Sequence, residues 1–383
     1  MLRHEAQLDS ALDPLIPRGL PSVNAKVRDV LRIGAYQLRY LERVPAHAAV
    51  TTAVDLARES VGDRVTGFVN AVLRRLPRED AGDTPPPRHR DPARLAERWS
   101  HPEWLVRRWV DRFGFDDTTA LLEWNNQHPP LVAQAARLSL EELRTRFDAA
   151  GVRHFPAPWD AGIVLDESHP DRLPGYAEGW FLIQDPAQAL VVRYAGVPEG
   201  AVAFDACAAP GGKTLAISAR ASHVIAGDAQ RRRIPRLRAN IVRAGRENID
   251  VIIADAAFPP VRECDFVLLD APCLGTGTFA RHPDARLRVQ QAALERLVRE
   301  QATLLDALAT RVRPGGVLCY ATCSLEPEEN KQQVDAFLAR NAEFMRAPLE
   351  GDYPLDSDGD LELLPHRDGM DGAYAARLVR MSE

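Results

Sequence analysis

The 383-residue sequence predicts an α/β protein whose main domain is a doubly wound, Rossmann-like parallel sheet. Three observations support this fold class. Apolar residues recur at helical spacing over residues 23–76, short strands mix with one helix over 130–180, and short apolar runs alternate with helical stretches from about residue 185. We therefore expect an all-helical domain at 1–80, a linker at 81–92, a small helical and α+β domain at 93–182 and the sheet domain at 183–383.

The N-terminal half of the chain is predicted to be mainly helical. Val27 to Leu38, Ala46 to Ala57 and Val65 to Leu76 place apolar groups three or four residues apart. In the linker, proline, glycine and charged residues replace this spacing. Asp91 to Asn126 is helical again and holds four tryptophans, which we interpret as core residues rather than base-stacking platforms. Leu140 to Ala150 supplies the helix of the α+β segment.

Composition and charge narrow the class of protein. The sequence holds no run of about 18 apolar residues and no charged-then-apolar leader, which argues against a membrane or secreted protein and for a cytoplasmic one. The five cysteines are an odd number, which suits reduced thiols. Residues 301–383 hold 8 basic and 15 acidic side chains, a net of −7 against −6 for the whole chain, so the first 300 residues are at +1. The acidic total therefore does not exclude a nucleic-acid partner.

Five apolar runs of the C-terminal half are each followed by a side chain that can do chemistry. The carboxyl ends of parallel strands lie at one edge of a sheet, and doubly wound sheets bind ligands there. We expect one crevice to be lined by the residues that follow these runs: Asp205, Asp228, Asp255, Asp270 and Cys323.

The first candidate site is the loop that follows Asp205. Its Gly-Lys-Thr sequence suggests a phosphate-binding loop, but Cys207 stands where that motif needs glycine, which disfavours a nucleotide triphosphatase. Asp228 is placed to accept bonds from ribose hydroxyls, and Asp255 could contact an adenine amino group. These features favour a nucleoside-bearing cofactor without an essential pyrophosphate, S-adenosylmethionine; the alternative is that the glycines only turn the chain.

The second and third candidate sites are Asp270–Gly277 and Tyr320–Ser324. An acid-Pro-Pro-aromatic sequence would indicate transfer to an exocyclic amino group, but Cys273 replaces the aromatic residue. Methylation at C5 of cytosine needs a thiolate that adds to C6, an acid near N3 and a proton acceptor. Asp270, Cys273 and Cys323 supply those types, although a single cysteine is more often a buried apolar residue. No Cys-x-x-Cys pair occurs, so we expect no metal.

These motifs closely resemble those of the RNA cytosine-C5 methyltransferases, and the resemblance extends over nearly the whole chain. It implies a class I methyltransferase domain in which Cys323 is the nucleophile, Cys273 assists breakdown of the adduct, Asp270 holds the base and Lys213 lines the active site. It also implies that S-adenosylmethionine is bound by Asp205, Cys207, Ala208, Ala209, Pro210, Gly211, Gly212, Lys213, Asp228, Arg233, Asp255 and Asp270.

The N-terminal part is similar to the antitermination factor NusB, through Leu31–Leu38 and Phe68–Arg75. A NusB-like domain fused to such a methyltransferase resembles the bacterial RsmB (Sun, Fmu) branch, which modifies one cytosine of 16S ribosomal RNA, the equivalent of position 967. The resemblance implies ribosomal RNA or a small-subunit assembly intermediate as partner, no membrane and a monomer. The chain starts late relative to a full NusB-like domain, so we expect its first helices to be missing.

Two replacements in the family pattern concern RNA contacts. Gln134-Ala135-Ala136 stands where Arg-x-Asn is usual, and Ala280-Arg281 where two arginines are usual. The alternatives are the same chemistry on transfer RNA or 23S ribosomal RNA, or a non-catalytic RNA-binding or ribosome-assembly factor. Two arginine clusters are expected to contact phosphates. The first follows Asp228 and could instead form a solvated helix face: Arg231, Arg232, Arg233, Arg236, Arg238 and Arg243. The second follows the Pro-Cys motif: Arg281, Arg286 and Arg288.

Overall fold

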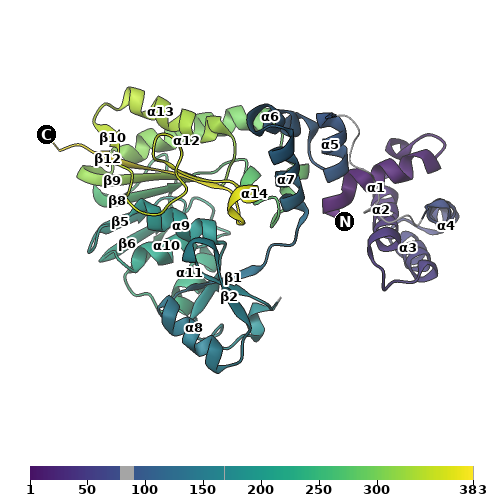
Figure 1. Cartoon of the computed structure of the whole chain (residues 1–383), viewed down its shortest axis with the longest axis horizontal. Coiled ribbons are helices and arrows are strands. Elements are labelled where there is room, and N and C mark those ends of the chain that lie inside the picture. Colours follow the sequence, from purple (N-terminus) through teal and green to yellow (C-terminus); the bar gives the residue numbers. More distant parts are fainter. Residues whose placement is uncertain (78–89, 168, 383) are drawn as a thin grey trace. The chain divides into compact units, whose positions relative to one another are not determined.

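The computed structural model describes residues 1–77, 90–167 and 169–382 (Figure 1). These residues form two compact units. Unit 1 consists of Met1–Asn126 and Pro283–Arg288, and unit 2 of Gln127–His282 and Val289–Glu383. Most of the predicted linker, residues 81–89, lies outside the described residues.

Unit 1 begins with four helices whose apolar stripes meet in one core. They are α1 (Glu5–Leu12), α2 (Ala25–Tyr40), α3 (Ala46–Ser60) and α4 (Thr66–Arg75). Leu31, Ala53 and Leu73 come from three different helices and are fully or almost fully buried. Gly34 lets these helices approach closely, since a Cβ at that position would lie 2.5 Å from Leu73 Cδ1. The three helical segments predicted from spacing are thus confirmed.

Three further helices belong to unit 1: α5 (Pro92–Trp99), α6 (Glu103–Phe113) and α7 (Phe115–Asn126). We predicted that they form one domain with the α+β segment that follows, and this boundary stays a prediction. Within unit 1, the Ala6 N–H donates to Ser100 Oγ at 3.1 Å, which joins the end of α5 to α1. Trp109 is buried, and the tryptophans of these helices are all at least partly buried, as the core interpretation requires.

Unit 2 contains a small antiparallel sheet with strand order β2-β3-β1-β4. Its elements are β1 (Leu131–Ala135), α8 (Leu140–Ala149), β2 (His154–Pro156), β3 (Ile163–Leu165) and β4 (Phe181–Ile183). Ser139 caps α8 in a reciprocal pair of hydrogen bonds with Glu142, which fixes where the helix begins. Phe147 of α8 packs against Phe181 of β4.

The large sheet of unit 2 has strand order β10-β12-β9-β8-β5-β6-β7, with β11 paired to β12. The strands β5, β6, β7, β8 and β9 are parallel, which confirms the predicted doubly wound sheet. Strand β12 runs antiparallel to β9, an extension that we did not predict. The strands are β5 (Val202–Asp205), β6 (His223–Gly227), β7 (Ile249–Ile252), β8 (Cys264–Asp270), β9 (Val312–Thr322), β10 (Phe344–Arg346), β11 (Leu361–Leu363) and β12 (Ala373–Arg380).

Helices cover both faces of this sheet (Figure 1). They are α9 (Pro186–Ala195), α10 (Gly212–Ser218), α11 (Ile234–Ala244), α12 (Gln291–Ala309), α13 (Lys331–Arg340) and α14 (Pro365–Asp368). Because successive side chains of a strand point to opposite faces, Ala203 packs toward α9, and Phe204 belongs to the core cluster of α12 and α13. Chain order reverses beside β5, which has β6 on one side and β8 on the other. A doubly wound sheet binds its ligand at such a switch point.

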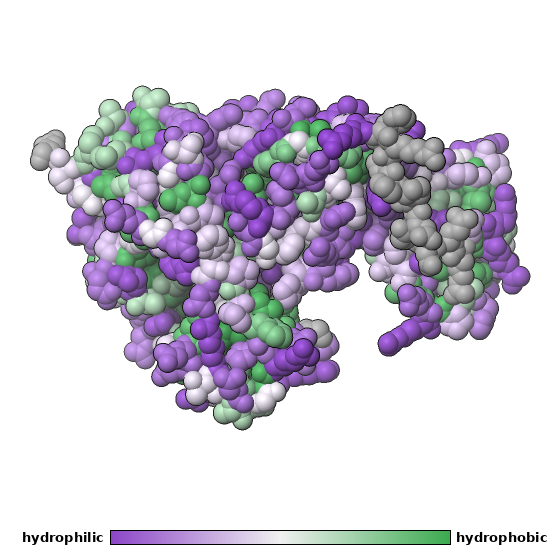
Figure 2. All heavy atoms as spheres, in the orientation of Figure 1, coloured by the Kyte–Doolittle hydropathy of each residue, from purple (hydrophilic) through white to green (hydrophobic). Residues whose placement is uncertain are grey.

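On the face shown in Figure 2, hydrophilic residues predominate and hydrophobic ones are scattered. Among the helices described, none combines the length and the apolar character that crossing a bilayer requires.

Candidate active site

Residues at the ends of neighbouring strands form the centre of the site. Asp205 ends β5, Asp270 ends β8, and Cys323 directly follows β9. These three strands are adjacent and parallel, so the three side chains share one edge of the sheet, as predicted. Asp228 follows β6 and Asp255 lies beyond the end of β7, farther along the same edge.

The loop between β5 and α10 lies beside two buried carboxylates. Asp205 accepts a hydrogen bond from Thr214 Oγ1 at 2.7 Å, and burial raises its pKa to about 7. Asp228 accepts from the Gln230 N–H at 2.7 Å and from the Ala209 N–H at 3.3 Å, which ties the loop to the end of β6. Arg233 Nη1 lies 4.0 Å from Asp228 Oδ2.

Two glycines bring this loop close to its neighbours. Gly211 has a φ of +107°, and a Cβ there would lie 2.7 Å from Leu237 Cδ1. A Cβ on Gly212 would lie 2.5 Å from Gln184 Nε2. The predicted loop residues thus form one turn at the switch point: Cys207, Ala208, Ala209, Pro210 and Gly211.

The carboxylates beyond β6 and β7 fit a nucleoside rather than a polyphosphate. Carboxylates follow the ends of β6 and β7, where ribose hydroxyls and an amino group would find acceptors. Asp228 is buried and Asp255 is exposed, with the Asp255 carboxylate accepting the Ala257 N–H at 2.9 Å. Within the described ranges, no group of histidine, cysteine, aspartate and glutamate side chains could hold a metal ion. Burial raises the pKa of the Cys207 thiol, so this cysteine is an unreactive member of the loop.

Two cysteines and an ion pair lie on the other side of Asp205. Cys273 Sγ and Cys323 Sγ are 3.4 Å apart, and both are free thiols. Lys213 is buried, and its Nζ lies 2.7 Å from Asp270 Oδ2. Burial alone would lower the pKa of Lys213, but the Asp270 carboxylate outweighs burial and raises it, so the lysine is charged.

The chemical state of Cys273 follows from its neighbours. Its contact with Cys323, together with burial, raises the pKa of the Cys273 thiol well above its usual range. Cys323 is held by its backbone, because the Gly277 N–H donates to Cys323 O at 3.0 Å. The Cys273 thiol therefore keeps its proton, and its sulfur lies 3.4 Å from the Cys323 sulfur.

Sequence reasoning missed a buried glutamate beneath the cysteine loop. Glu329 is fully buried, and its carboxylate accepts the Leu274 N–H at 3.1 Å and Gln301 Nε2 at 3.0 Å. Gln301 also donates to Pro272 O at 2.9 Å, so both ends of the Pro272–Leu274 segment are fixed. Burial raises the pKa of Glu329 to about 7. A signal was available: Gln301 is a polar residue at helical spacing between Leu297 and Leu304 on the buried face of α12.

The phosphate contacts expected at Arg281 and Arg286 are wrong. Arg281 Nη2 lies 2.6 Å from Asp185 Oδ2, and Arg281 Nε lies 3.2 Å from Asp371 Oδ2. Arg286 is fully buried within unit 1, where it donates to Asn126 Oδ1 at 2.7 Å. Burial lowers the pKa of Arg286 to about 10. Both guanidinium groups serve the fold, because their donors are already occupied by protein.

The fold and the site together define a class of protein, the class I methyltransferases, in which a nucleoside cofactor occupies the carboxyl edge of a doubly wound sheet. Sequence profiles of three families agree with this class. A profile described as 16S rRNA methyltransferase RsmB/F matches residues 196–379, the NusB family matches 1–78, and the ferredoxin-like domain of RsmF/B-like methyltransferases matches 101–170.

Curated relatives place the chain within one family. The chain is 32% identical over 398 residues to a probable ribosomal RNA small subunit methyltransferase B of Synechocystis sp., covering 99% of this chain and 89% of the relative. It is 34% identical over 390 residues to the ribosomal RNA small subunit methyltransferase B of Vibrio cholerae, covering 99% and 87%. The chain therefore belongs to the RsmB/F family of 16S ribosomal RNA methyltransferases, which use S-adenosylmethionine.

Solved structures share the fold. The crystal structure of PH0851 superimposes with a TM-score of 0.84 at 24% identity, covering 99% of this chain and 87% of that one. The structure of NSun6 from Pyrococcus horikoshii with SFG has a TM-score of 0.65 at 19% identity and covers 74% of this chain and 99% of that one.

Proposed function

We propose that the chain transfers a methyl group from S-adenosylmethionine to C5 of a cytosine in 16S ribosomal RNA, at the equivalent of position 967, through a covalent bond between Cys323 and C6. The observation that carries the proposal is the 3.4 Å separation of the Cys273 and Cys323 sulfur atoms at the strand ends that also hold the Lys213–Asp270 ion pair. We expect a cytoplasmic monomer that acts on ribosomal RNA or on a small-subunit assembly intermediate.

The chemistry assigns a different task to each residue. The Cys323 thiolate adds to C6, which makes C5 nucleophilic, and Asp270, held by Lys213, hydrogen-bonds the base beside N3. S-adenosylmethionine, when bound, supplies the electrophilic methyl group. A bound water or Asp270 then accepts the C5 proton, and the C6–S bond breaks so that its electron pair returns to the Cys323 sulfur.

The protonated state of Cys273 suits it to the release step. Its thiol keeps a proton because the adjacent Cys323 and burial both raise its pKa. The Cys323 sulfur leaves C6 with an electron pair, and a thiol 3.4 Å away can hydrogen-bond to that departing sulfur. We therefore assign attack to Cys323 and assistance of release to Cys273.

The cofactor is proposed to lie against the turn at residues 207–213. Asp228 would bind the ribose hydroxyls, Asp255 the adenine amino group, and Asp205 would hold the turn in place through Thr214. Arg233 lies beside the Asp228 carboxylate and would orient it.

Three single variants test the assignment. Cys323→Ala should abolish methyl transfer, whereas Cys273→Ala should accumulate a protein–RNA adduct, visible as a slowly migrating band on a denaturing gel. Cys264→Ala is the matched control, because Cys264 is a buried free thiol at the opposite end of β8 and should leave transfer intact. Full methyl transfer by Cys323→Ala would refute the proposal. Normal turnover by Cys273→Ala without the band would refute the release role.

The target nucleotide needs a separate experiment. Bisulfite mapping of 16S, 23S and transfer RNA from a deletion strain should show loss of a single 5-methylcytosine in 16S ribosomal RNA. Loss in transfer RNA or in 23S ribosomal RNA instead would keep the chemistry and contradict the proposed substrate.

A further inference from the structure

Helix α11 of unit 2 presents a strongly basic surface. Ile234, Leu237 and Ile241 form its buried stripe. The exposed surface of the helix and the turn before it hold four exposed arginines: Arg231, Arg232, Arg236 and Arg238. No acidic residue occurs between Asp228 and Glu247, so the positive charge is continuous along this segment. We name these four arginines the α11 basic face.

The α11 basic face lacks the ion pairs that neutralise several other exposed helix arginines among the described residues. Several exposed arginines on α6, α12 and α13 are neutralised by carboxylates, as in Arg107–Glu103, Arg296–Glu300 and Arg340–Asp306. In the part of the chain that the structure describes, no carboxylate oxygen lies within 4.0 Å of a side-chain nitrogen of the four arginines of the α11 basic face, and Arg232 bonds only to the Gln230 side-chain oxygen. Within the described residues, these four arginines thus lack the carboxylate partners that neutralise Arg107, Arg296 and Arg340.

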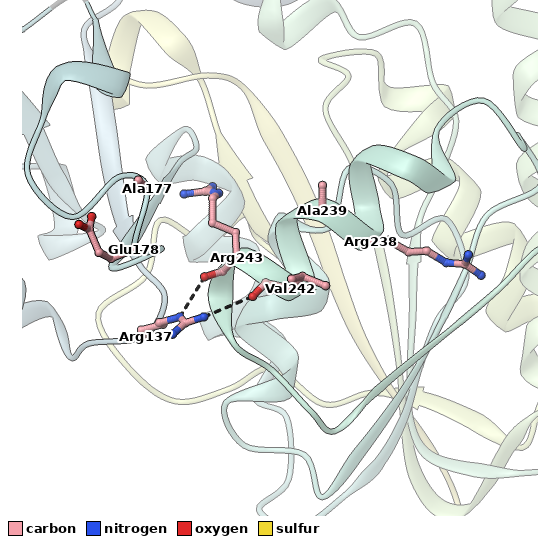
Figure 3. Close-up of a pocket in the computed structure, with 7 residues that line it drawn as sticks. All are labelled: Arg137, Ala177, Glu178, Arg238, Ala239, Val242 and Arg243. Atoms are coloured by element: carbon pink, nitrogen blue, oxygen red, sulfur yellow. Dashed lines mark hydrogen bonds between the residues drawn. The ribbon is translucent and has the colours of Figure 1, made fainter.

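An open groove of about 700 Å³ adjoins the face. Figure 3 shows Arg137 at the C-terminal end of α11, where Arg137 Nε donates to Arg243 O at 2.9 Å, while Arg238 extends away from it along the helix. Arg243 Nη1 donates to Phe181 O at 2.9 Å and so belongs to the fold. The groove lining contains one acid, Glu178, against three arginines.

Ala239 and Val242 lie between the arginines of the groove, and Val242 is 74% exposed. Small or apolar neutral side chains there leave room for a sugar–phosphate chain to approach the helix. At its other end the face is close to the proposed cofactor site, because only Ala229 and Gln230 separate Arg231 from Asp228, and three steps along the chain span at most about 11 Å.

We propose that the α11 basic face binds the phosphate backbone of the substrate RNA, leading the strand past the cofactor end of the sheet toward the groove at Arg137. The proposal rests on the proposed function, which makes RNA the substrate. Arginine is suited to this task because its planar, always charged guanidinium binds phosphate through two donors. These contacts are to phosphates, so they add affinity without reading sequence.

The test removes three of the four charges of the α11 basic face together. The variant combines Arg231→Gln, Arg236→Gln and Arg238→Gln, and leaves Arg233 in place because it belongs to the proposed cofactor site. The matched control combines Arg296→Gln, Arg299→Gln and Arg340→Gln, which removes the same charge from exposed positions on α12 and α13. Binding of a 16S ribosomal RNA transcript is measured as a function of salt, and binding of S-adenosylhomocysteine reports that each variant is folded.

The expected result follows from counterion release. Each phosphate contact to a single strand contributes about 0.7 to the slope of log affinity against log salt, so losing three contacts should lower the slope by about 2. Raising the salt from about 50 mM to about 200 mM should then reduce the RNA affinity of the variant by a factor roughly 20 times smaller than that of the wild type. The control should keep the wild-type slope.

An unchanged slope in the α11 variant, with S-adenosylhomocysteine still bound, would overturn the proposal and make the face a solvated one. An equal fall in slope in the control would overturn it as well, because the effect would then come from net charge. Failure of the proposed function would give a different result. The wild type would then not methylate 16S ribosomal RNA at C5, whereas the salt slopes of RNA binding by wild type, variant and control could still be compared.

Discussion

Glu329 is the residue whose ionisation should control the stability of the active-site loop. Its carboxylate is fully buried and accepts hydrogen bonds from Leu274 and Gln301, which hold the segment that carries Cys273. Glu329→Gln keeps the size of the side chain. The glutamine carbonyl can accept the same two bonds, because both end on Glu329 Oε1. The substitution therefore removes the titration of this group while leaving the packing in place.

The pKa fixes the sign and the size of the effect. Burial raises the pKa of Glu329 from its usual 4.5 to about 7, so the folded state favours the protonated acid. As the pH rises from about 4.5 to about 7, the unfolded chain ionises first, and the wild type loses folding free energy. This difference in pKa between the unfolded and the folded state corresponds to a loss on the order of 3 kcal/mol, which is complete above about pH 7. The variant does not titrate at this position and lacks that loss.

Amide hydrogen exchange of β8 and β9 measures the relevant free energy, since it reports the opening of unit 2 independently of unit 1. The stability of Glu329→Gln minus that of the wild type should rise by on the order of 3 kcal/mol between about pH 4.5 and about pH 8. Glu343→Gln, at an exposed carboxylate, is the matched control and should show no such rise. A difference between Glu329→Gln and wild type that is the same at every pH would refute the reasoning.

Two further predictions concern packing and cofactor binding. Gly34→Ala should destabilise unit 1 by about 1 to 3 kcal/mol, because the added Cβ would lie 2.5 Å from Leu73 Cδ1; a urea unfolding curve of the full chain that matches the wild type would contradict the packing described for α2 and α4. S-adenosylhomocysteine at about 100 times its Kd should stabilise the wild type by about 2.7 kcal/mol in a thermal shift experiment. Asp228→Asn should weaken that stabilisation, and an unaltered shift would show that Asp228 does not bind the ribose.

The sequence was sufficient to predict which strand-end residues come together. Asp205, Asp270 and Cys323 each follow an apolar run, and parallel pairing brings the ends of such runs to one edge whatever the details of packing. The antiparallel strand β12 was missed because Ala373–Arg380 alternates weakly and contains three alanines, which carry little strand signal.

Contacts that depend on how helices pack over the sheet could not be predicted in this way. Gln301 and Glu329 are 28 residues apart, and they meet only because α12 packs on the same face of the sheet as the segment that follows β9. The grouping of α5 with α1 has the same origin: the bond between Ala6 and Ser100 spans 94 residues and no local pattern indicates it.

Local charge, rather than proximity to a motif, separates the arginines with structural roles from those that we propose to bind phosphate. Arg281 follows the Pro-Cys motif directly, yet Asp185 and Asp371, 96 and 90 residues away in sequence, neutralise it. Sequence cannot reveal such distant partners, so its position beside a motif was misleading. Arg238 has no motif beside it, but the 18 residues between Asp228 and Glu247 contain no acid, which excludes the pairs at i+3 and i+4 that neutralise other helix arginines here. An acid-free run on an exposed helix is therefore the better guide to a phosphate contact, because it excludes local neutralisation in advance.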